Sequence, residues 1–311
     1  MTGVRVYNQL GQYAAARIAA VSPAVEVVEL PWDAAIPDVD AEVLFGGFGG
    51  NGGAQAALDR GCVRWLHMES TGVDKVPDAW FDLGITVTCA RGVHAVPIAE
   101  FAVACILEHE KRMPEIWVHE PHDPMAFTLG QLSGCTVGIV GFGGIGAACA
   151  QRLLPFGVRV KALRRTGVES PVHGVEMVTS LDAVLADADH VVLAAPLTDA
   201  TRRMIDDATF AAMKPGVHLV NVARGELVDH DALRRALDAN VVARASLDVT
   251  DPEPPPEGHW LYSHPKVFVS PHVSWSSPEG FGPIIDGFCA ELARYLRGEP
   301  LLGVVDPIER Y

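Results

Sequence analysis

Residues 136–146 decide the fold, and they read Thr-Val-Gly-Ile-Val-Gly-Phe-Gly-Gly-Ile-Gly. The first five are a short apolar run typical of a buried strand, and the amphipathic run Ala147–Phe156 that follows is typical of a helix. Gly141 allows a tight turn from strand to helix, Gly143 lets backbone approach a pyrophosphate, and Gly146 lets helix and strand pack closely. This spacing within a β-α-β unit predicts a dinucleotide-binding site.

The helix start offers phosphates its free N–H groups and the positive end of its dipole, so Gly144 and Ile145 join the predicted cofactor-binding residues. The next predicted strand ends in Arg164-Arg165-Thr166. An NAD site places an acidic residue on the ribose about 20 residues past the glycines, in this same region. Guanidinium groups instead suit a ribose 2′-phosphate. We therefore expect NADP as the preferred cofactor, with NAD as the alternative. A solvated basic turn is the other interpretation of these three residues.

Short β-branched runs alternate with helical patterns along the chain, which predicts parallel sheets flanked by helices and an α/β fold. The length of 311 residues indicates two domains, at about 150 residues per domain. Strands are predicted at 4–8, 25–30, 43–48, 63–68, 85–89, 136–140, 158–163, 190–194, 218–222, 244–247 and 267–269. Helices are predicted at 10–20, 53–60, 145–156, 181–187, 206–213, 230–239 and 278–297.

The boundary between the domains is expected near residues 96–99, where Pro97 can open a helix. The following run 98–107 is apolar nearly all round, so this helix should be buried. Residues 114–132 are rich in Pro, His and Asp and should form an irregular excursion, a kind of segment that often serves function or partner contacts.

Composition excludes several classes of protein. Lys and Arg number 24 against 39 Asp and Glu, so the formal charge is −15, which disfavours nucleic acid or an anionic membrane as partner. The longest apolar run, Phe101–Leu107, is far shorter than the ~20 residues that span a bilayer, and the first ten residues lack a secretory pattern. We expect a cytoplasmic protein.

Its six cysteines form no C-x-x-C pair and show no zinc spacing, which predicts reduced, buried, inert thiols and no metal site.

Three further segments each follow a predicted strand: Asn221–Gly225, Leu247–Pro254 and Ser270–Ser274. Ligands of an open parallel sheet bind beyond the carboxyl ends of its strands, so the three segments can converge on one cleft. Arg, Glu and His gathered beside a nicotinamide are suited to an anionic substrate that gains or loses a proton.

With these segments, the sequence resembles the D-isomer-specific 2-hydroxyacid dehydrogenase family along nearly its whole length. The resemblance implies two Rossmann-like domains, a flavodoxin-like substrate domain of residues 1–96 plus 283–311 and a doubly wound NAD(P)-binding domain of residues 97–282. The motifs that carry it are Gly72-Val73-Asp74, Gly141–Gly146, Pro196-Leu197-Thr198 with Thr201, Asn221–Gly225, Leu247-Asp248-Val249, Glu253-Pro254 and Pro271-His272.

The resemblance also implies roles for single residues. Arg224 would bind the substrate carboxylate and polarise the 2-oxo group, His272 would be the general acid/base, and Glu253 the carboxylate paired with its imidazole. Thr71 and Gly72 would offer backbone N–H groups to the substrate carboxylate. Taken alone, Arg224 is typical of a surface arginine, Glu253 of a solvated loop and His272 of a turn cap.

On the cofactor side, Asp248 would hold the nicotinamide carboxamide, while Pro196, Thr201 and Ala223 would line the cofactor cleft. Trp275 follows His272 closely and would either form a wall of the substrate pocket or pack in the core. His94 is expected to be structural, and Trp260 receives no assigned role.

We therefore expect an NADP-preferring oxidoreductase that reduces a small 2-oxo acid, of the glyoxylate or hydroxypyruvate type, to the D-2-hydroxy acid. A homodimer is expected because related enzymes are dimers. One alternative is an NAD-dependent biosynthetic enzyme such as a short 3-phosphoglycerate dehydrogenase, which Glu69 beside the predicted substrate loop disfavours. The other is a nucleotide-sensing protein like the family's corepressors, which retention of Arg224, Glu253 and His272 disfavours.

Overall fold

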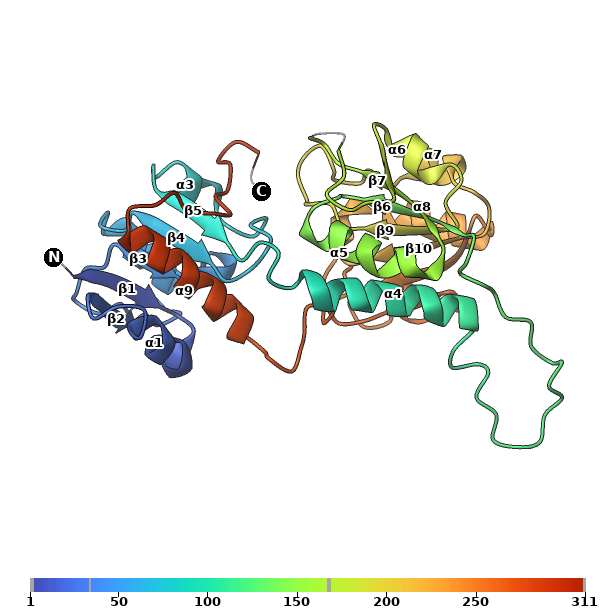
Figure 1. Ribbon diagram of the computed structural model, residues 1–311, viewed down its shortest axis with the longest axis horizontal. Coiled ribbons are helices and arrows are strands. Elements are labelled where there is room, and N and C mark those ends of the chain that lie inside the picture. The colour runs from blue at the N-terminus through green and yellow to red at the C-terminus, as the bar shows by residue number, and fades with distance from the viewer. Residues whose placement is uncertain (1–2, 34, 167–168, 310–311) are drawn as a thin grey trace. The chain divides into compact units, whose positions relative to one another are not determined.

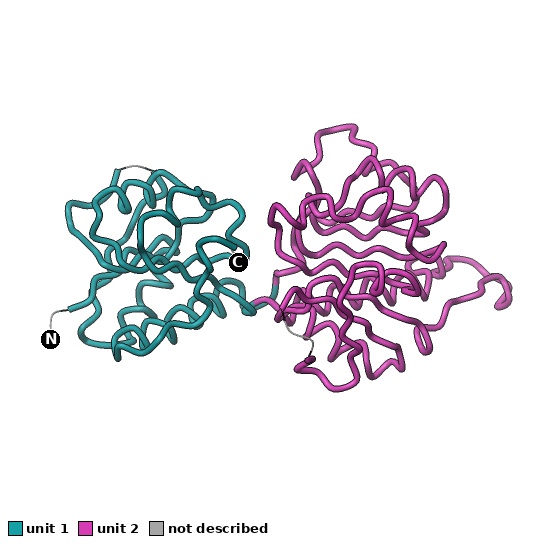
Figure 2. Tube along the Cα trace, turned by 90° about the horizontal axis from the view of Figure 1, so that it is seen from above, with its two compact units in different colours: residues 1–93, 277–311 teal, residues 94–276 magenta. Residues whose placement is uncertain are grey.

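The computed structural model describes residues 3–33, 35–166 and 169–309. The chain divides into two compact units (Figure 2): unit 1 comprises residues 1–93 and 277–311, and unit 2 comprises residues 94–276. The sequence set these divisions at residues 96/97 and 282/283. That unit 1 binds substrate and unit 2 binds cofactor stays a prediction.

Unit 1 contains, within its described residues, a five-stranded parallel sheet in the order β2-β1-β3-β4-β5. This is the flavodoxin-like order. The strands are β1 (Val4–Asn8), β2 (Val25–Glu29), β3 (Val43–Phe45), β4 (Trp65–Met68) and β5 (Thr86–Cys89).

Helices cover both faces of this sheet (Figure 1). Helices α1 (Gly11–Ala19) and α9 (Gly282–Leu296) pack in one buried cluster, and α2 (Gly52–Asp59) and α3 (Asp78–Phe81) pack in the other. Strand alternation divides the core, because Val43 and Phe45 face the α9 side while Leu44 faces the α2 side. The Phe45 ring stacks on Phe288 of α9 with ring centroids 4.1 Å apart.

Unit 2 is built on a sheet that, in the part of the chain described, has seven parallel strands in the order β12-β11-β10-β9-β6-β7-β8. The chain reverses direction along the sheet between β6 and β9, the topological switch point where doubly wound folds bind ligands. The strands are β6 (Thr136–Val140), β7 (Arg159–Leu163), β8 (Val175–Val178), β9 (His190–Leu193), β10 (Val217–Asn221), β11 (Val242–Leu247) and β12 (Val267–Val269).

Two helical layers enclose this second sheet. Helices α4 (Ala95–Lys111) and α5 (Gly144–Leu153) lie side by side on one face (Figure 1), and α6 (Leu181–Leu185), α7 (Asp207–Ala212) and α8 (His230–Asp238) pack on the other. Neighbouring residues of β6 divide between the layers, Ile139 toward α4 and α5 and Val140 toward α8. The expected α/β class with two Rossmann-like units is confirmed.

Some element boundaries differ from those predicted. The strand predicted to run to Phe48 ends at Phe45, because Gly46 and Gly47 have φ of +143° and +95°. The last helix begins at Gly282 rather than at residue 278, since Gly280 has a left-handed φ of +55° that interrupts a helix. Helix α3 and strand β8 were not predicted. Short 3₁₀ segments lie at Phe48–Gly50, Leu154–Phe156, Gly225–Leu227 and Trp260–Tyr262.

Helix α4 is buried along one side only, whereas its apolar run predicted burial as a whole, because Val96, Glu100 and Ala104 are exposed. It runs four residues beyond Leu107. Pro97 is its third residue, a position that needs no intrahelical N–H donor. The loop that follows α4 extends away from the body of unit 2 (Figure 1). In the described residues no helix has the length and apolar character needed to cross a bilayer.

The cysteines are free, as expected, but the expectation that all are buried is wrong for Cys62, Cys135 and Cys289, which are partly exposed. Burial raises the pKa of Cys149 to about 12, so this thiol is chemically inert at neutral pH.

Candidate active site

The predicted site residues of unit 2 lie along one edge of its sheet, because the carboxyl ends of its parallel strands share that edge. Along the edge, the residues that follow successive strands are His272 after β12, Asp248 after β11, Arg224 after β10, Pro196 after β9, Gly141 after β6 and Arg164 after β7. The predicted catalytic residues therefore lie toward one end of this edge and the predicted phosphate-binding residues toward the other.

The glycine turn has the geometry that its sequence predicts. Gly141 has φ of +98°, and a Cβ there would lie 2.4 Å from the backbone nitrogen of Ala195. A Cβ on Gly146 would lie 2.3 Å from the carbonyl oxygen of Gly141. A side chain on Gly141 would therefore push the turn away from the segment after β9, and one on Gly146 would push the helix away from the strand. At Gly143, by contrast, a Cβ would meet no atom within 4 Å. The open space beside Gly143 is suited to the close approach of a diphosphate.

Helix α5 begins directly after this turn and presents its positive end there. Gly143 is its N-cap and has no side chain to satisfy the first-turn N–H groups, which include those of Gly144 and Ile145. Gly143 and Gly144 are exposed and Ile145 is half-buried. These groups therefore fit the phosphates of a dinucleotide.

The arginine pair lies beside the glycine turn, on the adjacent strand. The Gly141 N–H donates to the Leu163 carbonyl at 2.9 Å, which places Arg164 and Arg165 immediately after the paired position. Both arginines and Thr166 are exposed, and Arg164 Nε donates to the Thr166 carbonyl. This arrangement places the positive charge of both arginines directly after β7, where the ribose 2′-phosphate of NADP is expected to bind.

The loop after β9 is held by the hydroxyl group of Thr201. Its Oγ1 donates to the Pro196 carbonyl at 2.7 Å and accepts from the Thr198 N–H at 2.8 Å. Thr201 thus shapes the loop, while the Pro196 ring is exposed at the edge. The sequence predicts that Pro196 and Thr201 both line the cofactor cleft. The structure shows that the hydroxyl group of Thr201 holds the loop after β9 in position.

Arg224 is positioned by a residue to which the sequence assigned no role, Asn221 at the end of β10. The Asn221 side chain accepts from the Ala223 N–H at 3.1 Å and donates to the Arg224 carbonyl at 2.8 Å. Arg224 itself is half-buried, and its Nη1 donates to the Ala223 carbonyl at 2.7 Å. An Asn that ends an apolar strand run is the signal that identifies such a clamp.

Asp248 organises the loop that carries His272. Its side chain is almost fully buried, with 1% exposure. Oδ1 accepts from Ser270 Oγ at 2.6 Å and from the Val273 N–H at 2.9 Å, and Oδ2 accepts from the Ser274 N–H at 2.9 Å. Its predicted contact with a nicotinamide carboxamide stays a prediction, for which Oδ2 retains acceptor capacity.

His272 and Glu253 are in direct contact. The His272 Nδ1 lies 2.8 Å from Glu253 Oε1, and the two side chains are 35% and 29% exposed. A carboxylate only accepts hydrogen bonds, so Nδ1 carries the hydrogen. The opposite nitrogen, Nε2, is then the atom that can take up or release a proton. The backbone of His272 has a left-handed φ of +53°, and its N–H donates to the Asp248 carbonyl at 2.9 Å.

Gly225 joins the arginine segment to the glutamate segment, a link that the sequence analysis missed. A Cβ on Gly225 would lie 2.0 Å from the carbonyl carbon of Thr250, which precedes the Asp251–Pro254 turn. The backbones of the two segments are therefore in van der Waals contact, and only glycine fits between them.

The two tryptophans differ in their surroundings. Trp275 donates from Nε1 to the His272 carbonyl at 2.9 Å, and its ring lies 5.6 Å from that of His94. Trp275 thus supports the His272 loop while packing against the core. Trp260 packs against the other core cluster, under the guanidinium of Arg234.

The predicted substrate residues of unit 1 lie in the loop after β4. Thr71 Oγ1 donates to the Ala90 carbonyl at 3.1 Å, and Ser70 Oγ donates to the Gly72 carbonyl at 2.7 Å. These side-chain contacts fix the loop at the carboxyl edge of the sheet of unit 1.

Comparison with known proteins identifies the family. Residues 103–274 match the model for the D-isomer specific 2-hydroxyacid dehydrogenase, NAD binding domain. The chain belongs to the D-isomer specific 2-hydroxyacid dehydrogenase family. Members of this family are oxidoreductases that act on CH–OH donors. The NAD-binding match covers the glycine turn, Arg224, Asp248, Glu253 and His272.

Individual relatives show the range of this family. The chain is 35% identical over 227 residues to glyoxylate reductase of Thermofilum pendens, a match that covers 70% of this chain and 66% of that enzyme. It is 32% identical over 251 residues to a chloroplastic D-3-phosphoglycerate dehydrogenase of Arabidopsis thaliana, covering 77% of this chain but 39% of the relative. A family enzyme from Xanthobacter autotrophicus, solved with NADPH and MES, is 26% identical and superimposes over 100% of both chains with a TM-score of 0.81.

Proposed function

We propose that this protein reduces a small 2-oxo acid to the D-2-hydroxy acid and prefers NADPH, with glyoxylate and hydroxypyruvate as the first candidate substrates. The observation that carries the proposal is the 2.8 Å contact between His272 Nδ1 and Glu253, which leaves Nε2 for proton transfer at the edge where Arg224 also lies. The similarity to a glyoxylate reductase supports this substrate class.

The proposed mechanism assigns a role to each residue of the candidate site. A bound nicotinamide supplies the hydride. The Arg224 guanidinium binds the substrate carboxylate and polarises the 2-oxo group, while Nε2 of His272 donates a proton to the oxygen of that group. Glu253 fixes the tautomer of His272 and balances its charge when the imidazole is protonated. The backbone N–H groups of Thr71 and Gly72 bind the carboxylate from unit 1.

The preference for NADPH rests on Arg164 and Arg165, with Thr166 beside them. No carboxylate occupies positions 164–166, where an acidic side chain on the ribose would favour NAD. Two exposed guanidinium groups after β7 favour a phosphorylated ribose. The relative solved with NADPH is consistent with this preference.

The test is a panel of 2-oxo acids assayed with NADPH and NADH in parallel. The expected result is reduction of glyoxylate or hydroxypyruvate with a higher kcat/KM for NADPH. Replacement of Arg164 and Arg165 by Ser should selectively lower kcat/KM with NADPH. Arg235→Ser on the exposed face of α8 is the matched control for loss of charge. Equal losses with NADPH and NADH would contradict the 2′-phosphate assignment.

A second candidate is 3-phosphoglycerate dehydrogenase activity, which the Arabidopsis relative favours. Such a substrate carries a phosphate that requires cationic partners, and the loop after β4 instead begins with the buried Glu69. Adding 3-phosphohydroxypyruvate to the panel separates the two functions. Its efficient reduction with NADH, in the absence of activity on glyoxylate, would favour the second candidate.

We also propose that the protein is a homodimer that uses the exposed side of α4. A largely apolar groove lies beside α4 in unit 2, and its lining includes Phe101, Ala104 and Phe268. Light scattering should give twice the mass of the chain, and Ala104→Arg should produce monomers. Ala208→Arg, at an exposed position of α7, should leave the dimer intact. A monomeric wild-type protein would refute this assembly.

A further inference from the structure

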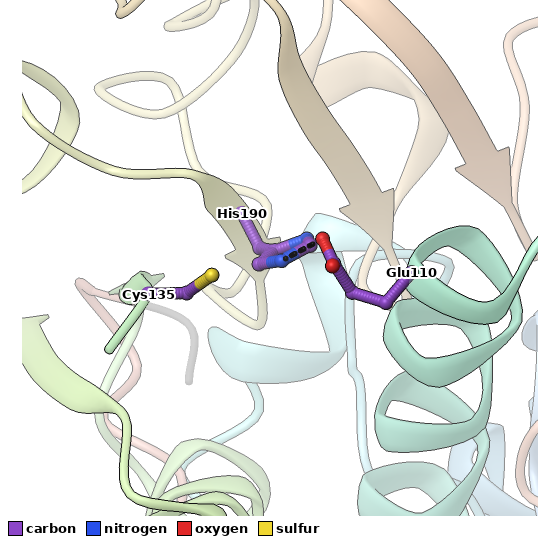
Figure 3. A group of neighbouring side chains, drawn as sticks. All are labelled: Glu110, Cys135 and His190. Carbon is purple, nitrogen blue, oxygen red and sulfur yellow. Dashed lines mark ion pairs between the residues drawn. The ribbon is translucent and has the colours of Figure 1, made fainter. Parts of the chain in front are cut away.

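Three side chains that can act as metal ligands meet at the amino edge of the unit 2 sheet, outside the candidate active site (Figure 3). Glu110 comes from the last turn of α4, Cys135 precedes β6, and His190 is the first residue of β9. One ligand atom of each residue lies within 4.8 Å of the other two. The sequence spacing gave no sign of this group, because its members come from three separate elements.

His190 has an unsatisfied polar atom that points into this group. Its side chain is only 1% exposed, and its Nδ1 lies 3.3 Å from Nδ1 of His218. The Nε2 atom makes no hydrogen bond, although Glu110 Oε1 lies 3.2 Å away. A neutral imidazole has one donor and one acceptor nitrogen, so donation from Nδ1 to His218 leaves a lone pair on Nε2. Buried polar atoms without a partner are rare, and a missing ion is one explanation.

The end of the loop that follows α4 packs closely against Glu110. A Cβ on Gly130 would lie 2.0 Å from Glu110 Oε2, so glycine makes room for the carboxylate. The Gly130 N–H donates to the Glu110 carbonyl at 2.8 Å, and Lys111 Nζ donates to the Gly130 carbonyl at 2.7 Å. Cys135 is tied to the same loop, since its Sγ donates to the Gln131 carbonyl at 3.2 Å.

We propose that Glu110, Cys135 and His190 bind a divalent cation of the zinc class, with water in the remaining position. A thiolate, an imidazole and a carboxylate are the ligands that Zn²⁺ prefers in proteins. On binding, the cation forms a bond to the Cys135 sulfur, and the thiol proton is released to solvent. No oxidation or reduction takes place.

The position of the site indicates a structural role rather than a catalytic one. Cys135 and His190 lie at the amino ends of β6 and β9, so this cluster is at the opposite edge of the sheet from Gly141 and His272. A bound cation would fasten the end of α4 and the end of the 112–132 loop to the sheet. We therefore expect it to stabilise unit 2 and to protect the loop.

The test uses untagged, chelator-treated full-length protein, with Zn²⁺ and Co²⁺ as the only added metals. Equilibrium dialysis should show one high-affinity Zn²⁺ ion per chain, and Co²⁺ should give a thiolate charge-transfer absorption band. Cys135→Ser and Glu110→Gln should each weaken Zn²⁺ binding by about 100-fold and remove its protection of the 112–132 loop from protease. Cys62→Ser, at a half-buried cysteine of unit 1, is the matched control and should bind like the wild type.

A readout on the wild-type protein avoids dependence on the folding of variants. Zn²⁺ should protect Cys135 from alkylation, measured by peptide mass spectrometry, and leave the alkylation of Cys62 unchanged. Absence of stoichiometric Zn²⁺ binding would overturn the proposal. Equal binding by folded Cys135→Ser protein, or alkylation of Cys135 at the same rate with and without Zn²⁺, would do so too.

Discussion

At the scale of single residues, the feature that distinguishes the candidate active site is the number of contacts that hold His272 in place. His272 is one of the non-glycine residues with a positive φ, and its imidazole, backbone N–H and carbonyl contact Glu253, Asp248 and Trp275 respectively. A left-handed backbone at a non-glycine residue costs free energy, and such strain is concentrated at functional sites. This geometry therefore supports a site arranged for chemistry rather than for packing alone.

Arg224 provides the first test at this scale. Arg224→Lys should lower kcat/KM for the 2-oxo acid by about 100- to 1000-fold, because lysine keeps the charge but loses the paired planar donors. Binding of NADPH, measured by fluorescence titration, should stay within about twofold of wild type. Near-normal turnover by this variant would show that Arg224 does not anchor the substrate.

Asp248 provides the second test. Asp248→Asn replaces one of the two carboxylate oxygens, which together accept from three donors, with an NH₂ group that cannot accept, so the variant should lose about 1–3 kcal/mol of unfolding free energy in the absence of cofactor. Its kcat should fall as well, because the His272 loop is displaced. Urea unfolding measures the stability, and Ser270→Ala is the milder comparison because both N–H donors remain. Unchanged stability of the Asn variant would contradict the anchoring role.

At the scale of elements, the site depends on close contact between backbones. Gly225→Ala should cost both activity and stability, since the new Cβ would lie 2.0 Å from Thr250 and must separate the Arg224 segment from the Glu253 segment. Gly287→Ala in α9 is the control, because its Cβ would only meet Val93 at an ordinary 3.5 Å. Thermal unfolding and kcat are the measurements. An active Gly225→Ala protein with wild-type stability would refute the contact.

The sequence predicts the elements that have long periodic patterns and the motifs that follow them. The glycine turn and the strand ends before Arg224 and Asp248 are visible because strand and helix periods switch at glycines and polar residues. Strand β8 was not predicted because its four edge residues, three half-buried and one exposed, carry little pattern. The contacts of Gly225 and Asp248 escaped for another reason, since they join segments that are distant in the chain and depend on tertiary packing.

At the scale of the whole molecule, the two units have separate cores and should respond separately to ligand. Their buried clusters are confined to residues of their own unit. A dinucleotide bound at the carboxyl edge of the unit 2 sheet stabilises only the form of that unit that binds it.

Unit 1 should lose stability in acid through one identifiable side chain, His67. Burial lowers the pKa of His67 to about 4, against 6.5 for the free side chain. Between pH 6.5 and pH 4, His67 is therefore protonated in the unfolded chain and neutral in the folded one. The contribution of neutral His67 to the free energy of unfolding is thus fully present above pH 6.5 and is lost as the pH falls toward 4. Linkage gives a loss of about 2 kcal/mol between pH 7.5 and pH 5.

The measurement compares wild type with His67→Phe by urea unfolding at pH 7.5 and at pH 5. The wild type should lose about 2 kcal/mol more than the variant. Burial raises the pKa of the nearby Glu69, which stabilises the folded state at low pH and loses that effect as the pH rises, but this contribution is common to both proteins. Equal pH dependence of the two proteins would exclude His67 as the source.

The contact between the His94 and Trp275 rings lies where the chain enters and leaves unit 2. The chain enters unit 2 at His94 and leaves it after Ser276, so these two rings lie at the two connections to unit 1. The same indole holds the carbonyl group of His272. Both chain connections between the units therefore begin beside the indole that is hydrogen-bonded to the backbone of the proposed proton donor.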